Sequence, residues 1–272
     1  MNQADGPKGR VLIVAGSDSG GGAGIQADIK TVTMLGGYAM TAVTAITVQD
    51  TMGVHGVWPV PVDAVLSQIS VTLADLGADV IKTGMLGSAS LVEAIAECID
   101  QTAQMVPRVI DPVMVATSGD RLVDGKAVEA IRSELVPRAR LVTPNAPEAE
   151  VLTGKAVETV DGQRRAAERL LELGAHGALV KGGHINGNRI TDVLQTTTGE
   201  WIFESPRLVT MSTHGTGCTL ASAIAAHLAR GASVPDAVEM ARDYLFGAIR
   251  SAKGLGKGHG PVNHGWILGV DR

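Results

Sequence analysis

Short apolar runs alternate along this chain with segments whose apolar residues recur at helical spacing. Residues 11–15 form an unbroken apolar run that ends at Gly16, which is typical of a strand buried on both faces. Between positions 25 and 35 the apolar residues then recur every three or four positions, which predicts a helix. The same patterns repeat, with helical stripes at residues 62–76, 91–99, 128–135 and 170–171 and apolar runs at residues 80–81, 109–110, 141–142 and 178–180. This alternation predicts the α/β class, in which helices cover both faces of a mostly parallel central sheet.

Two segments interrupt the alternation and predict small β additions to the sheet. Residues 40–48 and 54–60 have a strand-like composition and flank a turn at residues 50–53. Residues 190–203 have the pattern of a hairpin around residues 198–200. We therefore expect two hairpins beside the parallel strands.

The chain shows no internal division. No Pro- or Ser-rich linker, charge run or fixed-period repeat separates one part from another. A chain of 272 residues can bury a sizeable core as one large domain. We predict a single domain at residues 11–272, preceded by a polar tail at residues 1–10.

Charge and cysteine content exclude several classes of function. The chain has 23 Lys and Arg against 28 Asp and Glu, and this net charge of −5 is the wrong sign for a nucleic-acid binder. No stretch reaches the roughly 18 apolar residues of a membrane span, and the first apolar run is too short for an export signal. Cys98 and Cys218 lie far apart without zinc-ligand spacing, and Cys98 has the apolar company of a packed helix residue. We expect a cytoplasmic protein that acts on a small molecule, with neither nucleic-acid nor membrane partners.

Polar, glycine-rich segments follow the predicted strands. Ligands of an open parallel sheet bind beyond the carboxyl ends of its strands, so these segments predict a binding site. They are residues 16–24, 82–85, 111–114, 143–148, 181–184 and 213–218. The first segment is similar to a phosphate-binding turn, but it lacks the GK[ST] of a P-loop, and Asp28 comes too early for a ribose-binding acid. Taken alone, residues 16–24 are also consistent with a flexible turn that only connects the strand to the helix.

Residues 213–218 predict an anion site at the start of a helix. Gly215 and Gly217 free the backbone just before a helical stripe, so the first N–H groups can face an anion. Cys218 falls in the first helical turn, where we expect a lowered thiol pKa. The alternative is a small buried residue. His214 is a candidate activating base for Cys218.

Three charged residues at other strand ends complete the candidate chemistry. Asp111 and Glu148 could hold Mg²⁺ directly or through water, because hard cations prefer oxygen ligands. Lys181 could supply a point charge to phosphate, or it could be a solvated loop lysine. The spacing of Asn145 and Glu148 is also that of a helix cap with a first-turn acid.

Taken together, these segments resemble the ribokinase-like superfamily and, within it, the hydroxymethylpyrimidine/phosphomethylpyrimidine kinases of thiamine biosynthesis. The resemblance extends over about residues 11–263. The motifs that carry it are GSDSGGGAGIQAD at 16–28, AITVQD at 45–50, KTGML at 82–86, DPVM at 111–114, TPN at 143–145 with PE at 147–148, KGGH at 181–184 and HGTGCT at 214–219. Many sugar kinases of the superfamily have Asp where this chain has Cys218, whereas a few pyridoxal kinases share the cysteine. Residues 18–22 read DSGGG and depart from the more usual DPSGG or DSSGG.

This resemblance implies a three-layer α/β/α fold, a homodimer, and an ATP- and Mg²⁺-dependent enzyme. The implied substrates are 4-amino-5-hydroxymethyl-2-methylpyrimidine and then its monophosphate. The resemblance assigns Gln49 and Asp28 to pyrimidine binding, with pocket walls formed by Gly16, Ala23, Met85 and Val113. An amide such as Gln49 can pair with both a donor and an acceptor on an aminopyrimidine edge.

The remaining implied roles concern phosphoryl transfer. Cys218 would accept the hydroxyl proton, and the N–H groups from Gly215 to Cys218 would hold the transferring oxygens. Asn145, Lys181, Thr216 and Gly217 would bind the nucleotide, with Lys181 also catalytic, and Asp111 and Glu148 would bind the metal.

Three alternatives remain at this point. One is a pyridoxal kinase of the same superfamily. Another is a cysteine-dependent acyl transferase or hydrolase that uses Cys218 and His214, and a third is a catalytically silent nucleotide-binding regulator. The second domain of some bifunctional relatives is not expected in this chain.

Overall fold

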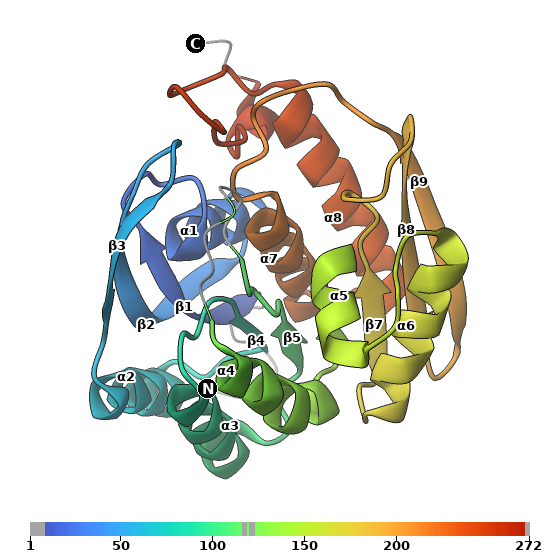
Figure 1. Cartoon of the computed structure of the whole chain (residues 1–272). Helices are drawn as coiled ribbons and strands as arrows, with labels where there is room; N and C mark the ends of the chain where they lie inside the picture. The colour runs from blue at the N-terminus through green and yellow to red at the C-terminus, as the bar shows by residue number, and fades with distance from the viewer. Residues whose placement is uncertain (1–8, 116–118, 120–122, 270–272) are drawn as a thin grey trace.

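One mixed sheet forms the centre of the molecule (Figure 1). The structure, a computed structural model, describes residues 9–115, 119 and 123–269, and within them nine strands lie in the order β3-β2-β1-β4-β5-β6-β7-β8-β9. Their bounds are β1 (Arg10–Asp18), β2 (Tyr38–Gln49), β3 (Val54–Pro59), β4 (Val80–Thr83), β5 (Arg108–Ile110), β6 (Leu141–Val142), β7 (Gly177–Val180), β8 (Arg189–Thr196) and β9 (Gly199–Pro206). Strands β1, β2 and β4 to β7 are parallel, whereas β3, β8 and β9 each pair antiparallel with the preceding strand. Both predicted hairpins, β2–β3 and β8–β9, are confirmed.

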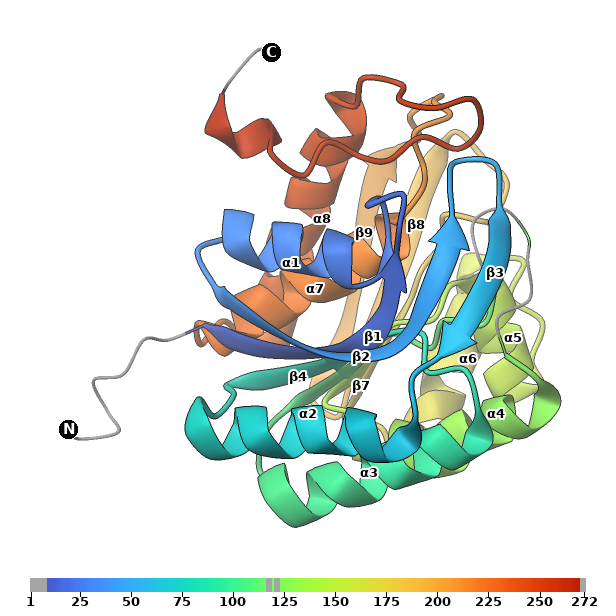
Figure 2. The ribbon, with the colours of Figure 1, turned by 90° about the vertical axis from the view of Figure 1, so that its left-hand side faces the viewer.

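Helices cover both faces of the sheet, which confirms the three-layer α/β/α class (Figure 2). One face carries α1 (Gly24–Met34), α7 (Thr216–Ala229) and α8 (Val234–Arg250). The other carries α2 (Val62–Asp75), α3 (Ala89–Ala103), α4 (Gly125–Ala130), α5 (Ala146–Thr153) and α6 (Val160–Glu172). Three short turns, η2 (Ile131–Leu135), η3 (Val136–Arg138) and η4 (Trp266–Leu268), complete the described elements. None of the described helices has the length and apolar character needed to cross a membrane.

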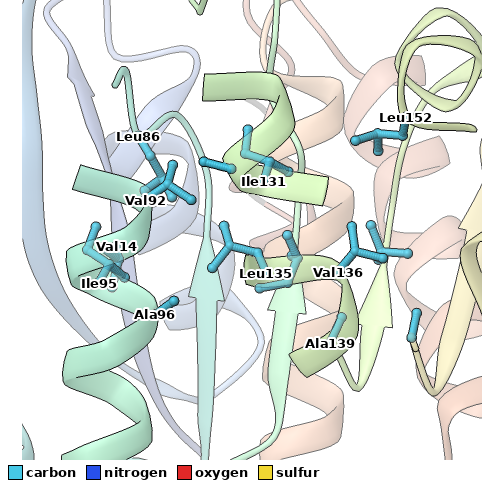
Figure 3. Close-up of a cluster of buried hydrophobic side chains, with 14 of the residues drawn as sticks. Val14, Leu86, Val92, Ile95, Ala96, Ile131, Leu135, Val136, Ala139 and Leu152 are labelled. Carbon is cyan, nitrogen blue, oxygen red and sulfur yellow. The ribbon is translucent and has the colours of Figure 1, made fainter. Parts of the chain in front are cut away.

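The central strands are apolar on both sides because each side contributes to a separate core. Along β1, Leu12 and Val14 face α2 and α3, whereas Val11 and Ile13 face α7 and α8. Figure 3 shows part of the first core, in which side chains of α3, η2 and α5 meet over the sheet. Cys98 is buried in this core, as predicted.

Several helices differ from their predicted extents. The stripe expected at residues 128–135 is divided between α4 and the π-helical turn η2, which continues into η3 at Pro137. α6 begins at Val160, well before the leucine pair at residues 170–171. α8 was not predicted, because three of its seven buried residues are alanine and one is glycine, which give a weak apolar signal. Residues 1–8 of the predicted tail lie outside the described residues, and Arg10 already belongs to β1.

The strand order creates one topological switch point. The chain leaves β1 toward β2 on one side, and later strands extend from β4 on the other side. Ligands of open α/β sheets bind at such a point, beyond the carboxyl ends of the strands. The loop after β1 and the residues after β4 therefore line the expected crevice.

Candidate active site

A cavity of about 950 Å³ lies at the carboxyl ends of the parallel strands. It brings together thirteen of the fourteen predicted site residues, and Asp28 is the exception. The residues in its lining are Gly16, Ala23, Gln49, Met85, Asp111, Val113, Asn145, Glu148, Lys181, Gly215, Thr216, Gly217 and Cys218. Sequence segments that are far apart thus contribute to one site.

The start of α7 is shaped as an anion cradle. Gly215, at the N-cap, has φ +78°, and a Cβ there would overlap the carbonyl of Gly22. Glycine has no side chain to cap the first turn of α7. The Thr216 N–H donates to the Thr213 carbonyl at 3.4 Å, and the next N–H groups, of Gly217 and Cys218, can face a ligand in the cavity. A Cβ on Gly217 would lie 3.5 Å from Lys181 Nζ and 3.8 Å from Asp111 Oδ2. The cradle, the lysine and the carboxylate are therefore immediate neighbours.

Lys181 and Asp111 form a nearly buried ion pair. Lys181 Nζ lies 3.3 Å from Asp111 Oδ1, which also accepts a hydrogen bond of 3.2 Å from Thr143 Oγ1. Burial opposes the charge on Lys181, but Asp111 and Glu148 raise the pKa of Lys181 above its usual value. Lys181 is consequently a fixed cation in the cavity wall and not a solvated loop lysine.

Asp111 Oδ2 is buried and has no hydrogen-bond partner among the described residues. Glu148 lies close enough for the charge of Asp111 to contribute to its raised pKa. No group of three or more His, Cys, Asp or Glu side chains in metal-binding arrangement occurs in the described part of the chain. Two carboxylates with one unsatisfied oxygen fit a hard cation that keeps water and phosphate ligands.

The helix-cap interpretation of Asn145 and Glu148 is confirmed. Asn145 Oδ1 accepts from the Glu148 N–H at 2.9 Å, and Glu148 Oε2 accepts from the Asn145 N–H at 2.8 Å. Burial raises the pKa of Glu148 to about 7, with Lys181 opposing and Asp111 adding to the shift. The capping contact fixes the Glu148 side chain at the cavity wall, so the two interpretations are compatible.

Cys218 was expected to have a lowered pKa, and that expectation was wrong. Burial raises the pKa of Cys218 to about 12, although the Lys82 ammonium and the Gly24 N–H favour the thiolate. The helix-terminus field is outweighed because the sulfur is packed into the protein even though part of the residue faces the cavity. The thiol is neutral at pH 7 in this state.

His214 does not activate Cys218. Its Nε2 lies 2.8 Å from Asp18 Oδ2, in a buried pair. A cysteine-dependent hydrolase requires a histidine paired with the thiol. Because His214 is paired with Asp18 instead, the structure does not support that alternative.

Asp28 does not line the cavity, which corrects its assignment to direct pyrimidine contact. The side chain is fully buried, with its two oxygens 2.9 and 3.0 Å from Lys82 Nζ and Ser222 Oγ donating to Oδ1 at 2.6 Å. Burial lowers the pKa of Lys82, but the charge of Asp28 more than offsets this and keeps the lysine ionised. The pair joins α1, β4 and α7 beneath the cavity.

Sequence reasoning missed Asp18, Ser19 and Lys82. Ser19 Oγ donates to the Gln49 carbonyl at 2.7 Å and accepts from the Gln49 N–H at 2.8 Å. Ser19 therefore fixes the backbone of Gln49, the candidate pyrimidine-binding residue. An Asp directly before a glycine run is typical of side-chain-to-backbone turn bonding, which is a usable signal for Asp18. A lysine inside an apolar strand indicates a buried partner, which is a signal for Lys82.

The fold and the site define a small-molecule kinase of the ribokinase-like class, since an anion cradle, a fixed lysine and paired carboxylates surround one cavity at the sheet's switch point. Residues 18–263 match the family model described as phosphomethylpyrimidine kinase. The chain belongs to the phosphomethylpyrimidine kinase family and is a kinase.

Named relatives agree with this assignment. A hydroxymethylpyrimidine/phosphomethylpyrimidine kinase of Streptomyces coelicolor is 49% identical over 95% of this chain and 95% of its own length. A thiamine biosynthesis bifunctional protein of Geobacter sulfurreducens is 50% identical over 95% of this chain, which spans about half (52%) of that protein. Among solved structures, an ADP complex of Bacillus subtilis pyridoxal kinase has a TM-score of 0.89 at 35% identity, with 97% of this chain and 100% of that chain covered.

Proposed function

We propose that this kinase transfers the γ-phosphoryl group of ATP to 4-amino-5-hydroxymethyl-2-methylpyrimidine and then to its monophosphate, in thiamine biosynthesis. The observation that carries the proposal is the single cavity, which holds an amide-bearing apolar wall and an anion cradle. The names of the relatives support the same substrates. ADP in the similar pyridoxal kinase supports nucleotide use.

The pyrimidine end of the cavity is bounded by Gln49, Ala23, Met85 and Val113. Gln49 offers both a donor and an acceptor, which matches the aminopyrimidine edge. A Cβ on Gly16 would lie 2.5 Å from the Met85 methyl carbon, so the Gly16 backbone and the Met85 side chain are close neighbours in this wall. Against this apolar wall, polar groups of a mismatched ligand would remain unpaired.

At the other end, Asn145, Lys181, Thr216 and Gly217 bind the nucleotide phosphates in this proposal. The first-turn N–H groups of α7 hold the transferring oxygens, and Lys181 balances their charge. Asp111 and Glu148 would hold Mg²⁺, which supplies charge neutralisation at the phosphates when bound. The unpaired Asp111 Oδ2 supports this assignment.

Cys218 is the candidate proton acceptor for the hydroxymethyl group. The raised pKa means that the thiolate is scarce at pH 7, so the first step should accelerate as the pH rises. In the second step the acceptor is already an anionic phosphate, and no base is required.

A coupled ADP-release assay tests the proposal. It compares hydroxymethylpyrimidine, its monophosphate and pyridoxal as acceptors, with and without Mg²⁺. Turnover of both pyrimidines supports the proposal. Turnover of pyridoxal alone would favour the pyridoxal kinase alternative, which the similar solved structure motivates.

The proposal includes a homodimer in the cytoplasm. Ile46 and Trp58 are cross-strand partners on the β2–β3 hairpin, and both are more than half exposed. Val48, on the same face of β2, is also exposed. An exposed apolar face at a sheet edge suits association with a second copy. The free thiols of Cys98 and Cys218 suit a reducing compartment.

A further inference from the structure

Asp18 organises the glycine-rich loop that follows β1. Its Oδ1 accepts from the Gly20 N–H at 2.8 Å, and its Oδ2 accepts from the N–H groups of Gly22 at 3.0 Å and Ala23 at 2.7 Å. Burial opposes the charge, but hydrogen bonds from His214, Ala23 and Gly20 hold the pKa of Asp18 below its usual value. One buried carboxylate therefore binds three backbone N–H groups of this loop.

The same carboxylate also contacts a residue that is far away in the sequence. Asp18 Oδ2 lies 2.8 Å from His214 Nε2, although the two residues are 196 positions apart. The His214 N–H donates to the Gly260 carbonyl at 3.1 Å, which holds the histidine backbone from the opposite side. His214 directly precedes Gly215, the N-cap of α7.

The two loops also touch through their backbones. A Cβ on Gly22 would overlap the His214 ring and lie 3.0 Å from Pro261 Cβ. A Cβ on Gly215 would overlap the Gly22 carbonyl. Gly22 and Gly215 therefore allow the two loops to lie in direct backbone contact beside the Asp18–His214 pair.

The Asp18–His214 contact joins the loop that forms part of the pyrimidine wall to the start of α7, which forms the anion cradle. On one side, Ala23 and Gly24 line the cavity, and the Gly24 N–H favours the thiolate of Cys218 through a hydrogen bond. Ser19 of the same loop brackets the backbone of Gln49. On the other side begins the anion cradle of α7.

We propose that Asp18 and His214 are positioning residues that hold the pyrimidine wall and the phosphoryl cradle in one fixed relation. The proposal rests on the proposed function, because it concerns how the acceptor oxygen is aligned with the transferring phosphorus. Neither residue takes a proton from substrate. A displacement of about 1 Å between such groups can cost on the order of 100-fold in rate.

The first test is steady-state kinetics of D18N, H214A and H214Q with both pyrimidine acceptors. We expect H214A to lower kcat for both steps by a similar factor, about 10- to 100-fold, because misalignment affects both transfers. H214Q should recover most of this loss, since the Gln amide can donate to Asp18 in place of Nε2. H176A, which removes an exposed histidine outside the cavity lining, is the matched control, and it should leave kcat and KM nearly unchanged.

A double-mutant cycle provides the second measurement. The double variant D18N/H214A should be no slower than the slower single variant, because both substitutions break one contact. Independent, additive losses would overturn the proposal. So would an H214Q variant as slow as H214A, or a normal kcat accompanied only by a lower Tm.

Hydrogen exchange separates this proposal from the proposed function. In H214A, amides at residues 20–24 and 215–218 should exchange faster together, whatever substrate the enzyme takes. Faster exchange at residues 215–218 alone would refute the coupling. Failure of the wild-type protein to phosphorylate either pyrimidine would instead refute the proposed function.

Discussion

At the scale of single residues, burial controls the protonation of two groups in the cavity lining, Cys218 and Glu148. Cys218 has a pKa of about 12 and Glu148 of about 7, and burial is the largest cause in both cases. One group is therefore neutral at physiological pH, and the other titrates within that range. The neutral thiol of Cys218 and the titrating carboxyl of Glu148 each have measurable consequences.

Cys218→Ala tests the proton acceptor. A base for a neutral alcohol is typically worth about 10² to 10⁴ in rate, so phosphorylation of hydroxymethylpyrimidine should fall by that order. Phosphorylation of the monophosphate should fall much less. In the wild type, the first-step rate should rise with pH without a plateau below pH 9, because the thiolate fraction increases up to its high pKa. Single-turnover rates for both steps provide the measurement, and an equal loss in both steps would mean that Cys218 only shapes the cradle.

Glu148→Gln tests the metal assignment. The variant should need more Mg²⁺ for half-maximal activity, and added Mg²⁺ should partly restore the rate. In the wild type the Mg²⁺ requirement should increase below pH 7, where Glu148 becomes protonated, and the variant should lack this pH dependence.

The same substitution has an expected effect on stability. Folding raises the pKa of Glu148 from 4.5 to about 7, so the free energy of unfolding decreases as the pH rises from 4.5 to 7 and stays at the lower value above pH 7. Glu148→Gln should therefore raise Tm at pH 8, and the gain should vanish below pH 4.5, where both states bind the proton. A Tm that is lower at every pH would show that the capping contact dominates.

Asp28→Asn should destabilise the protein strongly. It leaves the fully buried Lys82 without its counter-charge, and breaking such a pair typically costs about 3–5 kcal/mol. Chemical denaturation measures the loss, and Gln49→Ala, at the cavity wall, is the control that should raise pyrimidine KM with little change in stability. An Asp28→Asn variant of normal stability with a raised KM would restore the direct-contact role.

The candidate site residues were accessible from sequence because most of them follow strands as recognisable motifs. The protonation of Cys218 and the burial of Asp28 were not accessible. Both depend on neighbours contributed by other elements, such as Lys82 and Ser222, which no local pattern identifies. The Asp18–His214 contact was missed for the same reason.

At the scale of elements, the first turn of α7 has two glycines with different physical requirements. Gly215 adopts a left-handed conformation in contact with Gly22, so any side chain there disturbs two loops. Gly217 is helical, and a Cβ would meet only Lys181 and Asp111 at ordinary contact distances. Folding requires the first glycine, whereas the second keeps the cradle open.

Gly217→Ala separates folding from function. Alanine is the better helix former by about 1 kcal/mol, so Tm should stay the same or rise slightly. The added methyl group occupies the cradle beside Lys181, so kcat should fall and KM for ATP should rise. Gly125→Ala, where no atom of the described residues lies within 4 Å of the added carbon, is the control and should leave activity unchanged. Normal kinetics in Gly217→Ala would place the transferring phosphates elsewhere.

Element prediction succeeded where apolar periodicity was strong. β1 and the two hairpins were identified because their side chains alternate or are continuously buried. α8 was missed because alanine and glycine fill four of its seven buried positions, and the division of residues 128–135 follows from packing that the periodicity does not encode.

At the scale of the whole molecule, the sheet places its β2–β3 edge opposite its β8–β9 edge. The exposed apolar face at Ile46, Val48 and Trp58 belongs to the first of these edges. We expect Trp58→Glu to shift the protein from dimer to monomer in analytical ultracentrifugation, because a buried charge opposes association. Met105→Glu, at an exposed site outside this face, should leave the distribution unchanged. A wild type that sediments as a monomer would contradict the dimer proposal.

The Asp18–His214 contact joins residues that are synthesised far apart in time. A separation of 196 residues corresponds to about 10 to 40 seconds of translation at roughly 5–20 residues per second. During that interval the glycine-rich loop has emerged from the ribosome without the histidine that fixes it. The relation between the glycine-rich loop and the start of α7 is consequently fixed only late in synthesis.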